Sequence, residues 1–268
     1  MKQLNIGIIG AGRIGKVHMK SITYNVPGAK VLGITDVYKD ALPALAAEYG
    51  IEKIYGDYKE MLADPEIDAV LVCSSTDTHA DISIEAAKAG KHIFCEKPVD
   101  LTPEKVLAVI KAVKEAGVKL QVGFNRRFDH NFSHIRELIN EGKIGKLELV
   151  KITSRDPEPP SAEYAAVSGG IFLDMTIHDF DMACFIAGSE VEEVYVNATC
   201  LVDPAIGEAG DVDTAIISLK FKNGAIGVID NSRRAAYGYD QRVEAFGSLG
   251  AAVAANDTPT NVTLMTAD

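Results

Sequence analysis

The sequence contains no tryptophan, and its four cysteines show neither a CxxC pair nor zinc-ligand spacing. Cys73 and Cys95 lie in apolar, strand-like runs, where a thiol usually packs as a small buried side chain. A disulfide framework and a cysteine-based metal site are therefore not expected. The cysteine pattern predicts a reducing, cytoplasmic compartment.

Basic charge is also scarce, because 27 lysines and arginines face 38 aspartates and glutamates, giving a net charge of −11. Nucleic acids and anionic membranes both require a basic surface, so neither is expected as a partner. No apolar run is long enough to span a bilayer, and glycines interrupt the first one too early for a secretory signal. A neutral small-molecule substrate fits this balance of charge.

Two patterns alternate in the first half of the chain. Short apolar runs predict buried strands, and longer segments with helical spacing separate them. The predicted strands are Leu4–Ile9, Lys30–Ile34, Ala69–Cys73, His92–Cys95 and Leu120–Val122, and the predicted helices are Ile14–Tyr24, Ala41–Tyr49, His79–Ala89 and Pro103–Ala116, the last capped by Thr102. This alternation predicts an α/β domain, a doubly wound parallel sheet of the Rossmann type, over residues 1–123.

The pattern changes after Gly123. Helices are predicted near Asn131–Asn140 and Thr176–Ile186, and Asn223-Gly224 is typical of a hairpin turn. The predicted strands are Leu147–Ser154, Val191–Leu201, Asp213–Phe221, Ala225–Ser232, Gln241–Phe246 and Val262–Met265. Residues 124–268 are therefore expected to form an α+β domain on a largely antiparallel open sheet.

A glycine-rich turn joins the first predicted strand to the first predicted helix. GAGRIG at residues 10–15 matches GxGxxG. The first glycine of such a turn permits its tightness, the second lets a pyrophosphate approach, and the third packs helix on strand. Alone the motif could be an ordinary glycine turn, but its position favours a dinucleotide site at the helix N-terminus. The predicted contacts are Gly10, Gly12, Arg13, Ile14 and Gly15.

Asp36 indicates which dinucleotide binds. It ends the second predicted strand at about the 20-residue spacing typical of this motif. A carboxylate accepts hydrogen bonds from a ribose 2′-hydroxyl and repels a 2′-phosphate, so NAD is predicted, although Lys39 leaves NADP open. The turn Ser74, Ser75, Thr76 is predicted to form a second wall of the cofactor site, or alternatively to cap the next helix.

Two further motifs carry titratable groups. Glu96-Lys97-Pro98 ends a strand on the edge where ligands bind, so Glu96 and Lys97 are predicted to border the cofactor; a solvated surface lysine is the alternative. Asp174 and His178 are four residues apart and could share a helical face. A carboxylate that orients an imidazole makes a general base, whereas a helix cap and a core histidine would be the structural alternative.

Other residues allow weaker predictions. One of Arg126 and Arg127 could hold substrate or cofactor while the other forms a structural ion pair. Tyr237 and Asp240 could hydrogen-bond substrate hydroxyls or belong to an ordinary turn. His130 and His134 have helical spacing but no third ligand, so no metal site is predicted, and Asp179 and Asp181 are expected to cap or solvate their helix.

These motifs together resemble the family of glucose–fructose oxidoreductase and inositol dehydrogenase. GxGxxG, EKP and DxxxH occur in the family's order, and the strings FCEKPV, GFNRRFD and GGIFLDMTIHDFDMA are most similar to its inositol 2-dehydrogenase branch. The resemblance covers essentially the whole chain. It implies NAD-dependent oxidation of a secondary alcohol of a cyclic polyol, such as an inositol, to a ketone.

The resemblance also implies roles for residues. Lys97 would bind the reacting hydroxyl and favour its alkoxide, His178 would remove the proton, and Asp174 would orient His178. The implied substrate-binding residues are Lys97, Arg127, Asp174, His178 and Tyr237. The open sheet of the second domain would pack between subunits, so a homotetramer is expected.

Three alternatives stay open: a sugar or anhydrosugar dehydrogenase, an NAD-dependent glycosidase on the same scaffold, and a non-catalytic NAD-binding sensor. Lys97, Asp174 and His178 argue against a sensor, which needs none of them. Family members normally continue for several dozen residues with a further strand and a long helix. The C-terminal domain of this chain is therefore expected to be incomplete.

Overall fold

The computed structural model describes residues 3–257 and separates into two compact units, Met1–Phe124 and Asn125–Asp268. The predicted strand Val262–Met265 lies outside the described residues. The α/β fold class is confirmed, with a parallel sheet in the first unit and a mixed, mostly antiparallel sheet in the second. None of the described helices has the length and apolar character needed to cross a membrane.

The sheet of the first unit has the strand order β3-β2-β1-β4-β5-β6, and every pairing in it is parallel. Its strands are β1 (Leu4–Ile9), β2 (Ala29–Thr35), β3 (Lys53–Ile54), β4 (Ala69–Val72), β5 (His92–Cys95) and β6 (Leu120–Val122). The order reverses between β1 and β4, and ligands of open α/β sheets bind outside the carboxyl ends of the strands at such a reversal.

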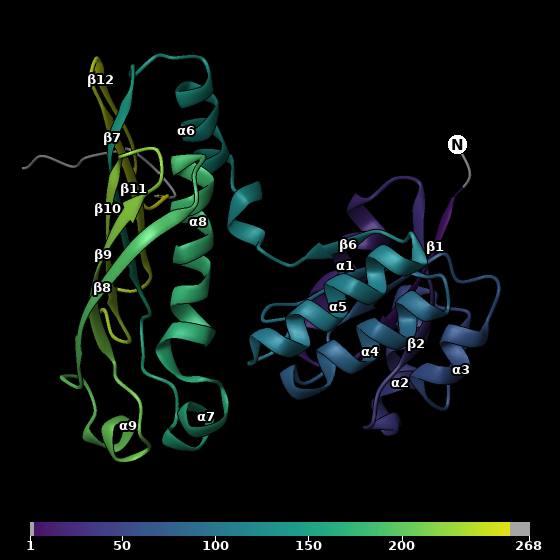
Figure 1. The fold of residues 1–268 in the computed structure, drawn as a ribbon. Coiled ribbons are helices and arrows are strands. Elements are labelled where there is room, and N and C mark those ends of the chain that lie inside the picture. The colour runs from purple at the N-terminus through teal and green to yellow at the C-terminus, as the bar shows by residue number, and fades with distance from the viewer. Residues whose placement is uncertain (1–2, 258–268) are drawn as a thin grey trace, which may run out of the picture. The chain divides into compact units, whose positions relative to one another are not determined.

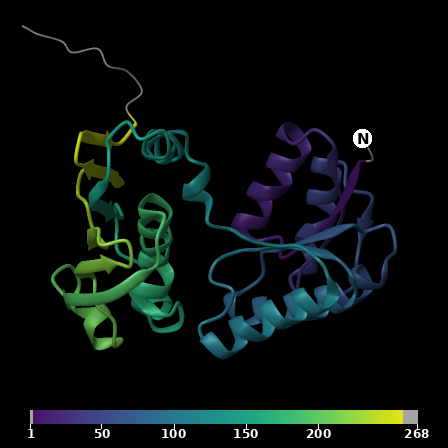
Figure 2. The same ribbon diagram turned by 45° about the horizontal axis from the view of Figure 1, so that its top comes forward.

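Helices cover both faces of this sheet (Figures 1 and 2). They are α1 (Arg13–Asn25), η1 (Lys39–Ala41), α2 (Leu42–Tyr49), α3 (Tyr58–Ala63), α4 (Thr76–Lys88) and α5 (Pro103–Ala116). Met19 of α1 and Leu42 of α2 belong to one apolar cluster, and Met61 of α3 and Ile82 of α4 to another. Burial of both faces explains why the strands read as unbroken apolar runs.

The predicted N-cap of α5 has the expected position but lacks the side-chain hydrogen bond of a cap. Thr102 does occupy the N-cap position of α5, but its side chain makes no capping bond. Its hydroxyl instead donates to Asp100 Oδ1 at 2.9 Å, and Asp100 also accepts from the Thr102 backbone N–H. This donated bond to a carboxylate is charge-assisted and fixes the hydroxyl toward Asp100.

The sheet of the second unit has the order β12-β11-β7-β10-β9-β8. Its strands are β7 (Leu147–Arg155), β8 (Val191–Thr199), β9 (Thr214–Phe221), β10 (Ile226–Ser232), β11 (Asp240–Gly247) and β12 (Gly250–Ala254). Consecutive hairpins alone do not build it, since β10 pairs in parallel with β7, and β11 pairs antiparallel with the other edge of β7. Ile152 of β7 thus lies opposite both Ile229 and Val243.

One face of this sheet is packed by helices (Figure 1). The helical segments are η2 (Asn125–Phe128), α6 (His130–Asn140), α7 (Ala162–Val167), the π-helical turn η3 (Phe172–Thr176), α8 (Ile177–Ala187) and α9 (Pro204–Glu208). Phe132 and Ile135 of α6 and Met182 and Ile186 of α8 enter one core with inward residues of the strands. The short helices α3, α7 and α9 escaped the sequence analysis because five or six residues carry too little periodicity.

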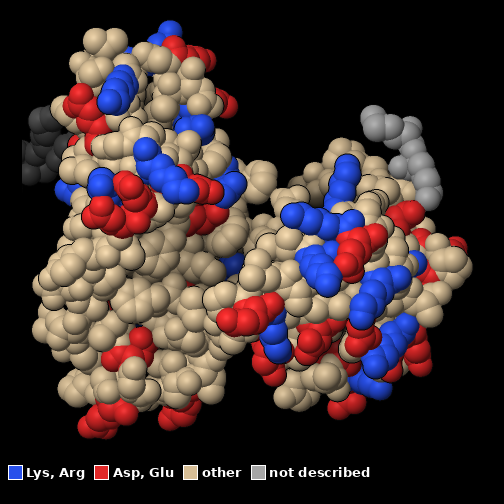
Figure 3. Space-filling model, in the orientation of Figure 1, with Lys and Arg blue, Asp and Glu red and all other residues tan. Residues whose placement is uncertain are grey.

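Along the strands of the second sheet, residues on the helix-packed face alternate with residues on the opposite face. In β9, Ala215, Ile217 and Leu219 are buried while Ile216 and Lys220 are exposed. Exposed apolar residues continue on this face across the neighbouring strands: Tyr195, Ile226, Phe246 and Val253. In Figure 3 the helical surface of the first unit intermixes basic and acidic side chains, so that the net negative charge forms no single-sign patch on this face.

Candidate active site

The glycine-rich turn has a distinct steric environment at each glycine. Gly10 has φ +100°, and a Cβ there would lie 2.5 Å from the Cys73 backbone. A Cβ on Gly15 would lie 2.0 Å from the carbonyl oxygen of Gly10, whereas one on Gly12 would meet nothing within 4 Å. Gly10 and Gly15 are therefore required by the protein's own packing. Gly12 instead keeps open a space that a ligand can enter.

A cavity of about 890 Å³ lies at the carboxyl ends of β1, β2 and β4. Of the predicted cofactor residues, Gly10, Gly12, Asp36, Ser74 and Ser75 line it. The other lining residues are Ile9, Thr35, Val37, Tyr38, Lys39, Gly56, Asp57, Tyr58, Cys73, Asp77, Thr78, Asp81 and Ile82. The predicted residues Arg13, Ile14, Gly15, Thr76, Glu96 and Lys97 are not among those lining it. The position and the open Gly12 suit a dinucleotide.

Asp36, which directly follows β2, already accepts two backbone N–H groups, one from the glycine-rich turn and one from its own loop. Its Oδ2 accepts the Ala11 N–H at 2.5 Å, and its Oδ1 accepts the Tyr38 N–H at 2.8 Å. Each carboxylate oxygen has further lone pairs, so Asp36 can still accept ribose hydroxyls. Beside it, Val37 and Tyr38 also line the cavity; they are 86% and 82% exposed and were not predicted from the sequence. Two large apolar or aromatic side chains directly after Asp36 were the available signal.

The Ser74 turn is connected to the segment that carries Lys97. The buried His79 places its Nε2 3.0 Å from the Ser74 carbonyl oxygen and its Nδ1 2.8 Å from that of Pro98. Ser74 and Thr78 also share a hydroxyl–hydroxyl hydrogen bond of 2.7 Å. Thus the wall of the cavity and the Lys97-Pro98 segment are held together through one side chain of α4.

The Glu96-Lys97-Pro98 segment follows β5 as predicted. The Glu96 carboxylate lies 2.7 Å from His18 Nε2, and the edge of the His18 ring contacts Phe94. Lys97 is half-buried, and the peptide between Lys97 and Pro98 is cis. Lys97 therefore follows the carboxyl end of a strand in the first unit, which is where its predicted role requires it.

Asp174 lies in the π-helical turn η3, immediately before α8, which carries His178. The predicted helix does extend back to Asp174, but with the wider π turn rather than as regular α-helix. Asp174 Oδ1 accepts the Tyr164 hydroxyl at 3.1 Å, and Arg233 Nη1 lies 3.2 Å from Asp174 Oδ2. Single π turns inside helices are frequent at functional sites. Neither partner was predicted; Tyr164 lies ten residues before Asp174 and Arg233 lies 59 residues after it.

The prediction that Asp179 caps or solvates its helix is wrong. Asp179 is fully buried and paired with the Arg126 guanidinium. Asn231 donates to Asp179 Oδ2 at 2.9 Å and accepts the Thr176 hydroxyl at 2.6 Å, and Arg126 donates to the Ser154 hydroxyl at 3.1 Å. Burial raises the pKa of Asp179, and Arg126 and Asn231 offset part of that rise. This network anchors the start of α8, next to His178, on β7 and β10.

Both candidate arginines have a carboxylate partner. Arg127 donates from Nε and Nη2 to Asp181, at 2.7 and 2.5 Å, and lies over the Phe185 ring. Its side chain is 43% exposed, compared with 13% for Arg126. Arg126 thus forms the structural ion pair expected of one of the two arginines, and Arg127 forms a second ion pair. A substrate-binding role for Arg127 stays a prediction.

Tyr237 and Asp240 form a hydrogen-bonded pair. The Tyr237 hydroxyl donates to Asp240 Oδ2 at 2.7 Å and accepts from Arg155 at 3.2 Å, while the Tyr237 side chain remains 68% exposed. Burial alone would raise the pKa of Asp240, but hydrogen bonds from Arg242 and Tyr237 outweigh it and lower the pKa. Asp240 thus serves as a buried anchor, and Tyr237 is the member of the pair that solvent can reach.

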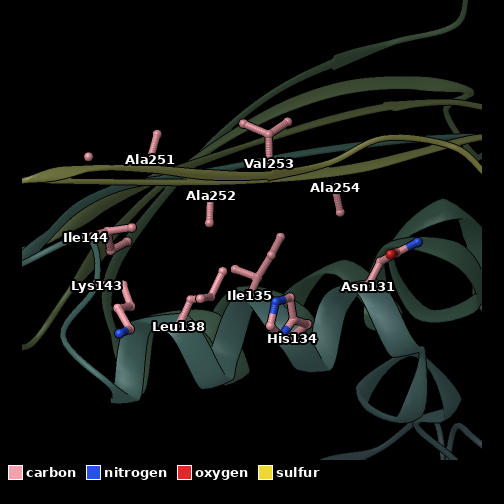
Figure 4. Close-up of a pocket in the computed structure, with 11 residues that line it drawn as sticks. Asn131, His134, Ile135, Leu138, Lys143, Ile144, Ala251, Ala252, Val253 and Ala254 are labelled. Atoms are coloured by element: carbon pink, nitrogen blue, oxygen red, sulfur yellow. The ribbon is translucent and has the colours of Figure 1, made fainter.

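A pocket of about 300 Å³ between α6 and β12 is separate from these residues (Figure 4). Ile135, Leu138 and Ala252 give it an apolar floor, and His134 and Asn131 lie at its rim. The His134 ring is exposed and lies 3.2 Å from Glu137. Within residues 3–257 no three His, Cys, Asp or Glu side chains are arranged to hold a metal ion.

Comparison with known proteins assigns both halves of the chain. Residues 4–124 match the model of the oxidoreductase family with an NAD-binding Rossmann fold, and residues 132–253 match the GFO/IDH/MocA C-terminal domain. The chain belongs to the GFO/IDH/MocA oxidoreductase family. The resemblance inferred from the three motifs is thereby confirmed, and so is NAD as the cofactor class of the first unit.

Close relatives in this family carry names of inositol enzymes. Myo-inositol 2-dehydrogenase of Thermotoga maritima is 54% identical over 97% of this chain and 78% of its own length. Inositol 2-dehydrogenase of Rhizobium meliloti is 49% identical over 99% of this chain and 79% of its own length. The structure of scyllo-inositol dehydrogenase from Lactobacillus casei with bound NAD(H) and scyllo-inositol is 31% identical, covers 99% of this chain and 80% of its own, and has a TM-score of 0.89.

The open position at Gly12 gives a direct test of the cofactor cavity. Gly12→Ala is expected to leave the thermal unfolding midpoint unchanged, because the added methyl group meets no protein atom within 4 Å. It should weaken NAD binding by roughly tenfold, or about 1.4 kcal/mol, because it occupies the space a pyrophosphate needs. Fluorescence titration with NAD and thermal unfolding measure the two effects. In the matched variant Gly15→Ala, the unfolding midpoint itself should shift to lower temperature, because the new Cβ collides with Gly10. If Gly12→Ala binds NAD as tightly as the native protein does, the assignment of this cavity to the cofactor is wrong.

Proposed function

We propose that this protein is an NAD-dependent dehydrogenase that oxidises one secondary alcohol of an inositol to a ketone. The observation that carries the proposal is the match to inositol 2-dehydrogenases at 49–54% identity over nearly the whole chain. The cavity at the carboxyl ends of β1, β2 and β4 supports the cofactor part of the proposal, because Gly12 is open and Asp36 stands at the end of β2.

We assign the chemistry to three side chains. NAD, when bound, supplies the carbon that accepts hydride. Lys97 binds the reacting hydroxyl oxygen, and its positive charge favours the alkoxide. His178 takes the hydroxyl proton as general base, and Asp174 stabilises the charge that His178 then carries. Arg127 and Tyr237 are the proposed further contacts to the hydroxyls of the polyol; Tyr237 is supported by its exposure and by its fixed hydroxyl.

The test is NADH formation, followed by absorbance, with NAD and a panel of myo-inositol, scyllo-inositol, glucose and sorbitol. We expect reduction of NAD with an inositol and slower reduction with glucose and sorbitol, and little turnover when NADP replaces NAD because Asp36 repels a 2′-phosphate. A preference for glucose would favour a sugar dehydrogenase. No turnover, together with NAD binding in a titration, would favour a sensor and overturn the proposed activity.

We further propose a homotetramer that uses the open face of the second sheet. Tyr195, Ile216, Ile226 and Phe246 are exposed there, and a stable monomer rarely exposes a contiguous apolar face. Lys220 pairs with Glu193 on the same face, which gives polar contacts between the apolar ones. Light scattering after size exclusion should give four times the 28.7 kDa chain mass, and Tyr195→Glu with Ile216→Asp should give smaller species. A native monomer at micromolar concentration would contradict this arrangement.

A cytoplasmic location is proposed from the cysteines. All four are free thiols in the structure. Burial raises the pKa of Cys95 to about 12, so that this thiol stays protonated and unreactive. Fractionation of the native host with a compartment marker tests this location.

A further inference from the structure

The side chain of Arg233 is buried beside the proposed catalytic pair. Arg233 follows β10, and its backbone N–H donates to the Asp213 carbonyl oxygen at 2.8 Å. Its side chain is 3% exposed. The backbone around it is also held, because the Ser232 carbonyl oxygen accepts from the Asp156 N–H and the Ala235 N–H, two residues further on, donates to the Asp156 carbonyl oxygen. The backbone thus fixes where this guanidinium can reach.

The guanidinium lies between two carboxylates. Arg233 Nη1 is 3.2 Å from Asp174 Oδ2 and 3.4 Å from Asp156 Oδ2. The other oxygen of Asp174 accepts the Tyr164 hydroxyl at 3.1 Å. Asp174 is therefore held on both oxygens, by Arg233 and by Tyr164. Asp174 and Asp156 have partly buried side chains, 18% and 25% exposed, and repel one another across the shared cation.

The hydrogen bonding of Arg233 is poor for a residue whose purpose is stability. Its Nε and Nη2 are buried and have no acceptor among the described residues. Each buried, unsatisfied donor costs stability, and a guanidinium carries five N–H groups to satisfy. Proteins tolerate such local costs mainly at functional sites. Of the three guanidinium nitrogens, Nη1 is the one with acceptors among the described residues, and it is shared by Asp174 and Asp156.

We propose that Arg233 is a positioning residue of the reaction, which orients Asp174 by sharing one guanidinium nitrogen between Asp174 and Asp156. The inference rests on the proposed function, because it assigns Asp174 to the catalytic pair. A guanidinium suits this task because it remains charged at any pH the enzyme meets and presents its donors in a fixed plane. Two neighbouring carboxylates without it would share a proton, as paired carboxylates do.

Charged and titratable groups surround Asp174 on several elements. Arg233 follows β10, Asp156 follows β7, Tyr164 belongs to α7 and His178 to α8. Burial raises the pKa of Asp156; Arg233 opposes that rise, Asp174 adds to it, and Arg126 of η2 also lowers it. Removing Arg233 leaves two carboxylates with less positive charge near them. One of them should then take up a proton at a higher pH than before.

The experiment measures kcat against pH for Arg233→Met, Arg233→Lys and the double variant Arg233→Met/Asp156→Asn. At neutral pH, Arg233→Met should lose kcat by on the order of 10- to 100-fold, the scale of a misplaced catalytic group. Its acid limb should move to higher pH, and activity should partly recover at alkaline pH. The kcat and acid limb of Arg233→Lys should fall between those of the native protein and of Arg233→Met. In the double variant the acid limb should return toward that of the native protein, because the second carboxylate, that of Asp156, is gone. NAD affinity should be unchanged.

Arg234→Met is the matched control, since Arg234 is the adjacent residue, is of the same type and is exposed. It should keep the native kcat and pH profile. A native pH profile in Arg233→Met, with only a lower unfolding temperature, would show a merely structural role and overturn the inference. Carbon-13 titration of aspartate carboxyls in native protein and Arg233→Met reports the same protonation without turnover; an unchanged titration would also overturn it. If Asp174→Asn keeps full turnover, Asp174 has no catalytic role and the inference fails while the proposed activity stands; if the native protein turns over no inositol, the proposed function itself fails.

Discussion

His178→Gln is expected to lower kcat for inositol oxidation by about 10²- to 10⁴-fold, the usual contribution of a general base. Glutamine retains a hydrogen-bonding side chain at the start of α8 but cannot accept the hydroxyl proton. The affinity for NAD should be unchanged, because the cofactor cavity is built from residues of the first unit. Steady-state kinetics with saturating NAD and an NAD titration measure the two quantities.

His134→Gln is the matched control, because His134 is an exposed histidine on α6 and is far in sequence from η3 and α8. Its kcat should equal that of the native protein. If His178→Gln also kept native kcat, the assignment of His178 as the base would be wrong. A loss of NAD affinity equal to the loss of kcat would instead indicate a change in folding rather than in catalysis.

Arg126→Met is expected to destabilise the protein by about 3–5 kcal/mol, the cost of leaving a buried carboxylate without its partner. Asp179 is fully buried, and Arg126 is its charged partner in the network that anchors α8. Methionine has a similar length and no charge, so the variant tests charge rather than volume. Urea unfolding followed by circular dichroism measures the difference.

The loss should depend on pH. Burial raises the pKa of Asp179 and Arg126 offsets part of that rise, so the pKa of this carboxyl in the folded variant lies higher still. In the unfolded chain an aspartate loses its proton near its ordinary value of about 3.9. Above that pH the unfolded variant is ionised while the folded one still holds its proton, so the stability of the variant falls as pH rises. The difference from native protein should therefore be small in acid and complete at neutral pH.

Two companion variants separate the causes. Arg127→Met removes the neighbouring arginine, whose side chain is 43% exposed, and should cost about 1 kcal/mol or less. Arg126→Met/Asp179→Asn removes both charges of the buried pair and should recover much of the stability, because no uncompensated charge remains. An equal loss in Arg126→Met and Arg127→Met, or no recovery in the double variant, would contradict the role given to this ion pair.

Local sequence patterns predicted most of the elements near the active site. The bounds of β1, β5, β6 and α5 were predicted to the residue; a glycine directly follows β1, β6 and α5, and α5 begins with Pro103. The strand β3 is only two residues long, and no period can be recognised in so short a segment. The second sheet was predicted as mostly antiparallel, but its parallel pairing of β7 with β10 was not, since strand order is not a local property.

The sequence by itself determined the family, the α/β class and the residues proposed for the chemistry, because GxGxxG, EKP and DxxxH are short motifs. Tertiary structure alone decided which side chains surround them. Arg233 reaches Asp174 from 59 residues away, and Arg126 reaches Asp179 from 53 residues away. A sequence shows that such residues carry charge but not which are buried, and burial decides whether a carboxylate needs a partner. For this reason Asp179 looked like a helix cap in the sequence and is a buried anchor in the fold.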